Sequence, residues 1–193
     1  MTAQAATGQE AAVDAARFRT VLGHFCTGVT VVTGYGADGP AGFACQSFAA
    51  LSLDPPYILF CPGKASRAWP VIEAAGYFAV NVLGESQRDV STVFGSPGDD
   101  RFSRVDWTRA ESGAPILDGA LTWIDCAVET VHDAGDHFIV VGRVRELGEI
   151  AEDRPLLFYR GRYAAIGLER GEAAPAPEHL TAFLTWPGPD DWV

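Results

Sequence analysis

The chain has 193 residues, of which 48% are hydrophobic and 20% charged, enough apolar material for one core and too little charge for a disordered chain. The net charge of −11 argues against nucleic acid as the main partner, because phosphate backbones are bound by basic faces, although a local basic pocket for a small phosphate remains compatible with it. The four scattered cysteines form no C-x-x-C pair, which predicts reduced thiols of a cytoplasmic protein and no metal site. Neither a signal peptide nor an apolar run of roughly 18 residues is apparent.

The first element expected is an amphipathic helix. Residues 1–13 are rich in Ala, Gly and Gln, and we expect a flexible arm there. From Asp14 the apolar residues Phe18, Val21, Leu22 and Phe25 recur at helical spacing, and Gly28 is expected to end the helix. This helix should pack its apolar face against the core. One domain is expected over residues 14–168, followed by a proline-containing tail over 169–193.

A glycine-rich segment follows the first predicted strand. Residues 29–33 are all β-branched and predict a strand. Residues 34–39 match G-x-G-x-x-G, a pattern that binds dinucleotides only where it opens a helix. Pro40 and Gly42 follow without helical periodicity, so we interpret the segment as a hairpin loop. A Rossmann unit is therefore not expected.

Two further segments have the composition of binding elements. Residues 42–52 alternate small and large side chains, which suits either close approach of a planar ligand or a tightly packed pair of strands. Residues 62–67, with Lys64, Ser66 and Arg67, place two cations and a hydroxyl between a predicted strand (57–61) and a predicted helix ending at Gly76. Such a junction favours anions, or it is an exposed basic turn; it is not a Walker loop.

The remaining pattern is mainly β. A strand over 77–83 is followed by a helix that Ser86 could cap, and residues 106–119 look irregular. A long hairpin over 121–132 and 137–147 and a last hairpin over 155–159 and 163–168 complete the chain. Seven to nine mostly antiparallel strands with three short helices predict a mainly β fold, a barrel with helical covers.

His137 is the main catalytic candidate. Gly135 and Asp136 suit a tight turn, so His137 would open the outgoing strand at a sheet rim, facing a ligand or simply solvent. The other histidines, at positions 24, 132 and 179, are far apart in sequence, and packing suffices to explain the first two. Residue types alone do not exclude a Ser-His-Asp hydrolase, but no nucleophile lies on a G-x-S-x-G elbow. The absence of an obvious nucleophile favours a protein that works through a cofactor.

Five motifs in a characteristic order and spacing stand out: Phe25–Thr33, Gly42–Phe48, Ser52–Pro56, Phe78–Leu83 and Gly135–Val144. Together they resemble the small flavin reductases, the reductase components of two-component flavin-dependent monooxygenases, and the resemblance covers about residues 18–166. Four segments, Gly42–Leu53, Leu156–Gly161, Ala182–Leu184 and Asp191–Val193, extend it to the subgroup that serves an actinobacterial hydroxylase of a secosteroid phenol in steroid catabolism.

The resemblance implies an FMN-binding split β-barrel homodimer that uses NADH to reduce FMN or FAD, which then leaves for a partner oxygenase of steroid (cholesterol) or aromatic catabolism. It implies that His137 is catalytic and meets the nicotinamide with Gly135 and Asp136. Many relatives have Asn where Gln46 stands. Flavin-dependent oxidases and non-catalytic flavin-binding proteins remain alternatives. The residues implied to line the flavin ring and ribityl chain are Thr27, Gly28, Val29, Thr30, Val31, Ala44, Cys45, Gln46 and Ser47; those implied to face its phosphate are Ser52, Lys64, Ser66 and Arg67.

Overall fold

The computed structural model describes residues 13–98 and 100–167. The predicted arm (all but Val13), the predicted tail over 169–193, and Leu168 at the end of the last predicted hairpin lie outside the described residues. No helix within the described ranges is long and apolar enough to cross a membrane.

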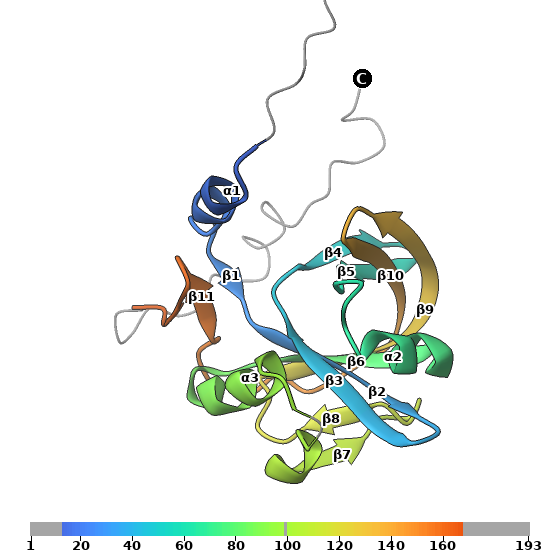
Figure 1. The fold of residues 1–193 in the computed structure, drawn as a ribbon. Coiled ribbons are helices and arrows are strands. Elements are labelled where there is room, and N and C mark those ends of the chain that lie inside the picture. The colour runs from blue at the N-terminus through green and yellow to red at the C-terminus, as the bar shows by residue number, and fades with distance from the viewer. Residues whose placement is uncertain (1–12, 99, 168–193) are drawn as a thin grey trace, which may run out of the picture.

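A seven-stranded antiparallel sheet in the order β3-β2-β6-β9-β10-β5-β4 forms the body of the molecule (Figure 1). Its edge strands, β3 and β4, are consecutive in the chain and joined only by Gln46 and Ser47, so the curled sheet forms a barrel that is not closed. The mainly β prediction is confirmed. The strands are β2 (Thr30–Gly36), β3 (Gly39–Cys45), β4 (Phe48–Leu53), β5 (Pro56–Phe60), β6 (Tyr77–Val82), β9 (Thr122–Ala134) and β10 (His137–Leu147).

The core lies where α2 (Trp69–Ala75) packs on the sheet. The rings of Phe60 and Phe78 meet edge to face with centroids 5.0 Å apart, and Phe60 meets Trp69 at 5.8 Å. Such aromatic pairs add stability beyond the area that they bury. The helix ends as predicted at Gly76, whose φ of 75° is a left-handed conformation suited to glycine.

The loop and turn predictions had mixed outcomes. The turn Ala37-Asp38 joins β2 to β3, which confirms a hairpin loop at the glycine-rich motif. The region over 106–119, expected to be irregular, contains the hairpin of β7 (Trp107–Arg109) and β8 (Pro115–Leu117). The described part of the chain holds twelve strands, more than expected, because five of them have only two or three residues.

A buried asparagine explains why this missed hairpin forms. Asn81 on β6 has no exposed surface, and its Nδ2 donates to Val31 O at 3.2 Å and to Thr33 Oγ1 at 3.1 Å. Leu117 N donates to Asn81 Oδ1 at 2.8 Å. The β7-β8 hairpin is therefore attached to the sheet by tertiary hydrogen bonds, which no local pattern reveals.

The third helix, α3 (Arg88–Gly95), begins differently from the prediction. A 3₁₀ turn over Glu85–Gln87 precedes it, and Ser86 lies inside this turn without capping the helix. Gln87 takes the anchoring role instead: it accepts from Gly84 N at 3.1 Å and donates to Asp118 O at 2.9 Å.

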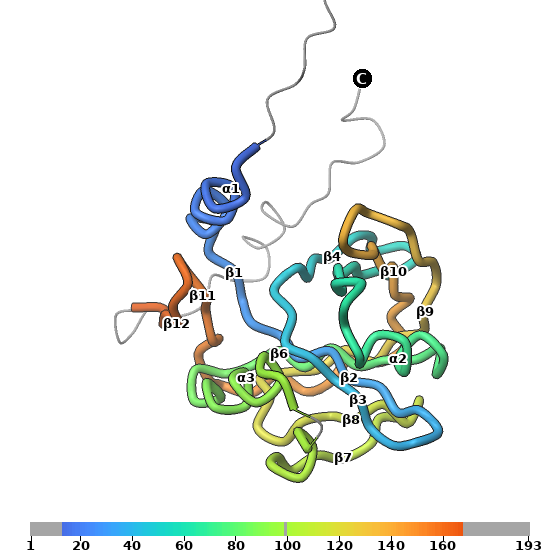
Figure 2. The backbone as a smooth tube through the Cα atoms, in the orientation of Figure 1, coloured from blue at the N-terminus to red at the C-terminus, as the bar shows by residue number. Residues whose placement is uncertain are grey.

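The first helix does not pack as expected. The side chain of Asp14 caps α1 (Ala15–Leu22) by accepting from Ala16 N and Arg17 N, but the helix ends before Gly23, earlier than Gly28. None of its residues is buried, so the prediction of core packing is wrong. Figures 1 and 2 show α1 standing away from the main sheet. It is connected through β1 (Thr27–Gly28), which pairs with β11 (Leu157–Tyr159) and, through it, with β12 (Arg162–Ala164).

Candidate functional site

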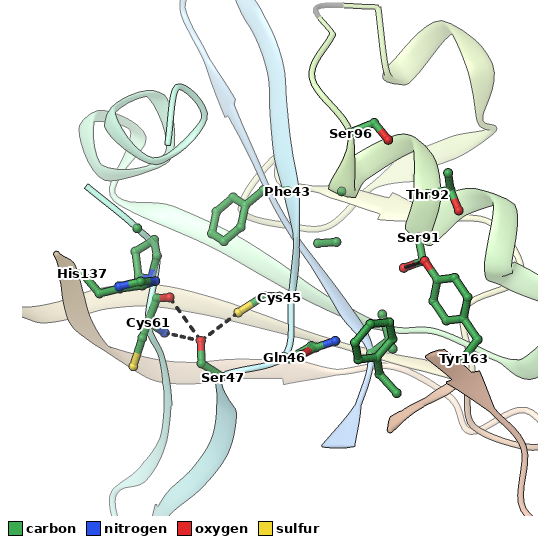
Figure 3. A pocket seen from close by; sticks show the side chains of 16 residues that line it. Phe43, Cys45, Gln46, Ser47, Cys61, Ser91, Thr92, Ser96, His137 and Tyr163 are labelled. Carbon is green, nitrogen blue, oxygen red and sulfur yellow. Dashed lines mark hydrogen bonds between the residues drawn. The ribbon is translucent and has the colours of Figure 1, made fainter. Parts of the chain in front are cut away.

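The main pocket has a volume of about 530 Å³ and lies at the open side of the barrel (Figure 3). The end of β3 and the Gln46-Ser47 link form one wall of the pocket. The start of β10 and the residues that follow β5 lie beside each other and also line it. Helix α3 and the β11-β12 hairpin form the opposite wall with Ser91, Thr92 and Tyr163. The hydroxyl of Tyr163 donates to Ser91 Oγ at 2.9 Å, which joins the hairpin to the helix.

Ser47 holds the β3-β4 link against the end of β5. Its Oγ accepts from Cys61 N at 3.0 Å, donates to Cys61 O at 3.1 Å, and lies 3.3 Å from Cys45 Sγ. Burial raises the pKa of the Cys45 thiol, and the hydrogen bond with Ser47 only partly offsets this. Cys45 is therefore a neutral thiol near pH 7 and is not activated as a nucleophile.

His137 lies at the opposite side of the pocket from α3 and is the first residue of β10, as predicted. Its backbone is fixed by a bridge to Gly63, with Lys64 N donating to Asp136 O and Phe138 N donating to Pro62 O, each at 2.9 Å. The imidazole Nδ1 lies 2.7 Å from Asp136 Oδ1, and the side chain is 49% exposed. This hydrogen bond holds the pKa of the Asp136 carboxyl below its usual range. An ionised Asp136 favours the proton on Nδ1 and leaves Nε2 for a ligand.

A second cavity of about 360 Å³ continues from the main pocket and shares Phe43, Ala44, Gly95 and Ser96 with it. Its far end is lined by residues of the loop before α2, Ser66 and Arg67 among them, and by Arg101. Sequence reasoning missed Arg101. The only signal was a cation within the polar loop that follows the third helix.

An apolar groove of about 650 Å³ adjoins the main pocket on the side of α1. Phe18, Leu22 and Phe25 line it, as does Phe158 from β11. Gln46 and Ser47 line both spaces, so the groove and the pocket share one wall. The groove also reaches Thr27, whose Oγ1 is buried without a hydrogen-bond partner in the structure.

The structure brings many of the predicted site residues together around these cavities. The main pocket is lined by Val29, Ala44, Cys45, Gln46, Ser47 and His137; the second cavity by Ser66 and Arg67; and the groove by Thr27. Arg67 also lines a third, smaller cavity of about 130 Å³.

The other predicted residues lie outside these cavities. Lys64 forms an ion pair with Asp133 and stands 5.3 Å from the centre of the Phe138 ring. Thr30 donates to Cys45 O at 2.8 Å and so holds the end of β3. Val31 is in the core, and Gly28 pairs with Leu157. Ser52 on β4 pairs with Tyr57 on β5, and Gly135 and Asp136 form the turn before His137.

Few side chains here could act without a cofactor. Across residues 13–98 and 100–167, no three His, Cys, Asp or Glu side chains are grouped to hold a metal ion. Cys45, Ser47 and Cys61 have no histidine hydrogen-bonded to them among the described residues. The arrangement instead offers backbone, small side chains and one fixed imidazole, which suits binding and orienting of ligands.

Comparison with known proteins identifies the family. The model of the flavin reductase like domain matches residues 22–167. The chain is 54% identical over 182 residues to the flavin-dependent monooxygenase reductase subunit HsaB of Rhodococcus jostii, covering 94% of this chain and 93% of that protein.

Solved structures agree in fold. A nitrilotriacetate monooxygenase component B homologue of Mycobacterium thermoresistibile is 55% identical with a TM-score of 0.80, over 88% of this chain and 96% of that chain. An NADH:FAD oxidoreductase of Streptomyces globisporus, solved with NAD and FAD fragments, is 36% identical with a TM-score of 0.77, over 81% of this chain and 95% of that chain. The split-barrel prediction is thereby confirmed, and the chain belongs to the flavin reductase family.

Proposed function

We propose that the main pocket is where flavin and NADH meet, and that the chain is an NADH-dependent flavin reductase supplying reduced FMN or FAD to a separate oxygenase. The observation that supports this most is the pocket itself, with the Gln46-Ser47 wall, a neutral Cys45 thiol and His137 at its rim. The relatives named as reductase subunits of monooxygenases support the oxygenase partner. With the resemblance in the tail motifs, they favour an oxygenase of steroid or aromatic catabolism.

The residues present fit a flavin. A volume of about 530 Å³ suits a small-molecule ligand, and the adjoining cavity extends it toward Arg67 and Arg101. Ala44, Cys45 and Ser47 present small side chains, so a planar ring can approach the backbone at the end of β3. The unpaired Thr27 hydroxyl in the adjoining groove is available to a polar ring atom.

Flavin, when bound, supplies the redox chemistry by accepting a hydride from NADH. The chain's own residues bind and orient. Asp136 fixes the His137 ring, so Nε2 can take a hydrogen bond from the nicotinamide carboxamide and position it over the flavin. Ser47 and Thr30 hold the end of β3 in place, which keeps the ring-binding wall rigid. No side chain has to act as a nucleophile.

We expect NADH oxidation only when flavin is supplied. Protein stripped of flavin should leave the NADH absorbance unchanged, and adding FMN or FAD should start its loss and yield reduced flavin under anaerobic conditions. Repeating the assay with NADPH measures nicotinamide preference. Turnover without flavin would contradict the proposal. Flavin binding without NADH oxidation would favour the non-catalytic alternative.

We also propose a homodimer built across α1. Phe18 is 53% and Phe25 77% exposed, and with Leu22 they line an apolar groove. Exposed apolar surface of this extent is typical of protein interfaces. The groove shares Gln46 and Ser47 with the main pocket, so a second copy seated there would complete the flavin site. The four free cysteines favour a reducing compartment, and we place the protein in the cytoplasm.

Phe25→Glu should separate the dimer, because it puts a charge into an apolar interface. Light scattering at micromolar concentration should give a dimer mass for the wild type and a monomer mass for the variant, which should also bind flavin more weakly. Ile150→Glu is the matched control, since Ile150 is 84% exposed but lies outside the groove. A monomeric wild type would rule out the dimer.

A further inference from the structure

Arg101 is held in a fixed position at the junction of two structural elements. Its Nη1 donates to Gly42 O on β3 at 2.9 Å, and its Nη2 donates to Ser96 O, just after α3, at 2.8 Å. A guanidinium has five N–H donors, and these two contacts leave three. The Nε is buried without a partner in the structure, so the side chain is placed but its hydrogen-bonding capacity is only partly used.

Within the described residues, the charge of Arg101 also has no counterion. Among residues 13–98 and 100–167, no carboxylate forms an ion pair with it, although other cations such as Lys64 and Arg143 have one. A half-buried cation without an anion is costly, and a bound anion would relieve that cost. The whole chain carries a net charge of −11 and would repel a phosphate elsewhere, so a local cation at the pocket is required to hold one.

The cavities lead from the proposed ring site to this cation. The second cavity continues from the main pocket past Phe43 and Ser96 to Arg101, and the third cavity of about 130 Å³ lies beyond, against Gly42 and Arg101. Ser66 is on the same route; its Oγ accepts from Trp69 N at 3.2 Å, which leaves its hydroxyl proton available to an acceptor. An elongated ligand with a planar ring at one end and a phosphate near its middle or far end matches this path.

We propose that Arg101 binds the phosphate of the flavin nucleotide and makes the site select FMN and FAD over unphosphorylated riboflavin. This inference rests on the proposed function and adds a specificity-determining residue to it. The planar fork of Arg101 matches the geometry of phosphate oxygens, and the contacts to Gly42 O and Ser96 O aim it before the ligand arrives. Lys64, the cation suggested by its sequence position, is engaged with Asp133 instead.

Binding of FMN and riboflavin to Arg101→Gln tests the inference directly. Titrations followed by flavin fluorescence, without NADH, should show that wild-type protein binds FMN more tightly than riboflavin. In Arg101→Gln the Kd for FMN should rise about 10- to 100-fold toward that of riboflavin, because a charge-assisted contact is lost, while the Kd for riboflavin stays unchanged. Arg101→Lys keeps the charge without the fork, so a smaller rise for FMN alone is expected.

Arg104→Ala is the matched control. Arg104 is an exposed cation three residues further along, it lines none of the three cavities, and its loss should leave both affinities unchanged. If Arg104→Ala lost as much affinity for FMN as Arg101→Gln, the inference would be overturned, and a diffuse electrostatic field would explain FMN binding instead. So would equal losses of FMN and riboflavin in Arg101→Gln, which would assign Arg101 a structural role through Gly42 and Ser96.

The remaining outcomes are also decisive. If Arg101→Gln raised the KM for NADH and left the ratio of FMN to riboflavin affinity unchanged, Arg101 would bind the dinucleotide rather than the flavin phosphate. That result would overturn the inference. If Arg101→Gln does not fold by circular dichroism, Arg101→Lys decides, and an unchanged FMN to riboflavin ratio there counts against Arg101. Wild-type protein that binds neither flavin would refute the proposed function itself, a result distinct from failure of this inference.

Discussion

Replacing His137 by alanine is expected to raise the KM for NADH and lower kcat/KM about 10- to 100-fold, while flavin affinity stays near that of the wild type. The imidazole is proposed to orient the nicotinamide, and one lost orienting hydrogen bond costs roughly 1–3 kcal/mol of transition-state stabilisation. The residue is on the rim at the start of β10, across the pocket from α3 and separate from the second cavity. Steady-state kinetics with saturating flavin and a separate flavin titration give both quantities.

Two further variants show whether the fixed orientation of His137 matters. Asp136→Ala removes the acceptor for Nδ1 but keeps the imidazole, so it should reproduce part of the loss in kcat/KM. His132→Ala is the control, because His132 is an exposed histidine of the same hairpin that does not line the pocket. A His137→Ala variant that loses flavin but keeps its KM for NADH would reverse the proposed roles. No change in either would leave His137 as an ordinary hairpin residue.

Replacing Asn81 by leucine is expected to lower the free energy of unfolding by about 2–4 kcal/mol. The change keeps the approximate volume but leaves Leu117 N and the carbonyl of Val31 without their partner in the core. Buried polar groups left unpaired cost about 1–3 kcal/mol each. Urea unfolding should show a lower midpoint at an unchanged slope.

The effect should be coupled to Thr33. Asn81 Nδ2 donates to Thr33 Oγ1 at 3.1 Å, so Thr33→Val in the Asn81→Leu background should cost less than it does alone. Thr108→Val, on the exposed face of β7, is the control and should change stability by less than about 0.5 kcal/mol. Additive effects of the two core substitutions would contradict a shared hydrogen-bond network.

Local chemistry explains why much of the fold could be predicted. The β-branched residues of β2, the turn before His137 and the glycine that ends α2 each have one favourable conformation, and the φ values of Gly76 and Gly135, 75° and 65°, agree with it. Periodicity identified the apolar face of α1 but not its partner, because amphipathicity states which side is apolar and not what covers it.

Tertiary contacts explain why the rest could not. The β7-β8 hairpin depends on Asn81, which is more than 20 residues away in sequence. Lys64 looked available as a phosphate ligand because its ion pair with Asp133 spans two elements distant in the chain. Arg101 acquires its position only when β3 and the end of α3 meet, so its place in a polar loop did not by itself indicate a binding role.

The order of strands in the main sheet has a consequence for synthesis on the ribosome. Phe60 of β5 pairs with Val140 of β10, about 80 residues later, so β5 has no partner on that side until most of the domain has been made. At about 5–20 residues per second, the growing chain waits roughly 4–16 s with one edge of this apolar strand unpaired. Loop closure over such a distance also slows folding. During that interval the edge of β5 that later pairs with β10 is exposed and can associate with other chains.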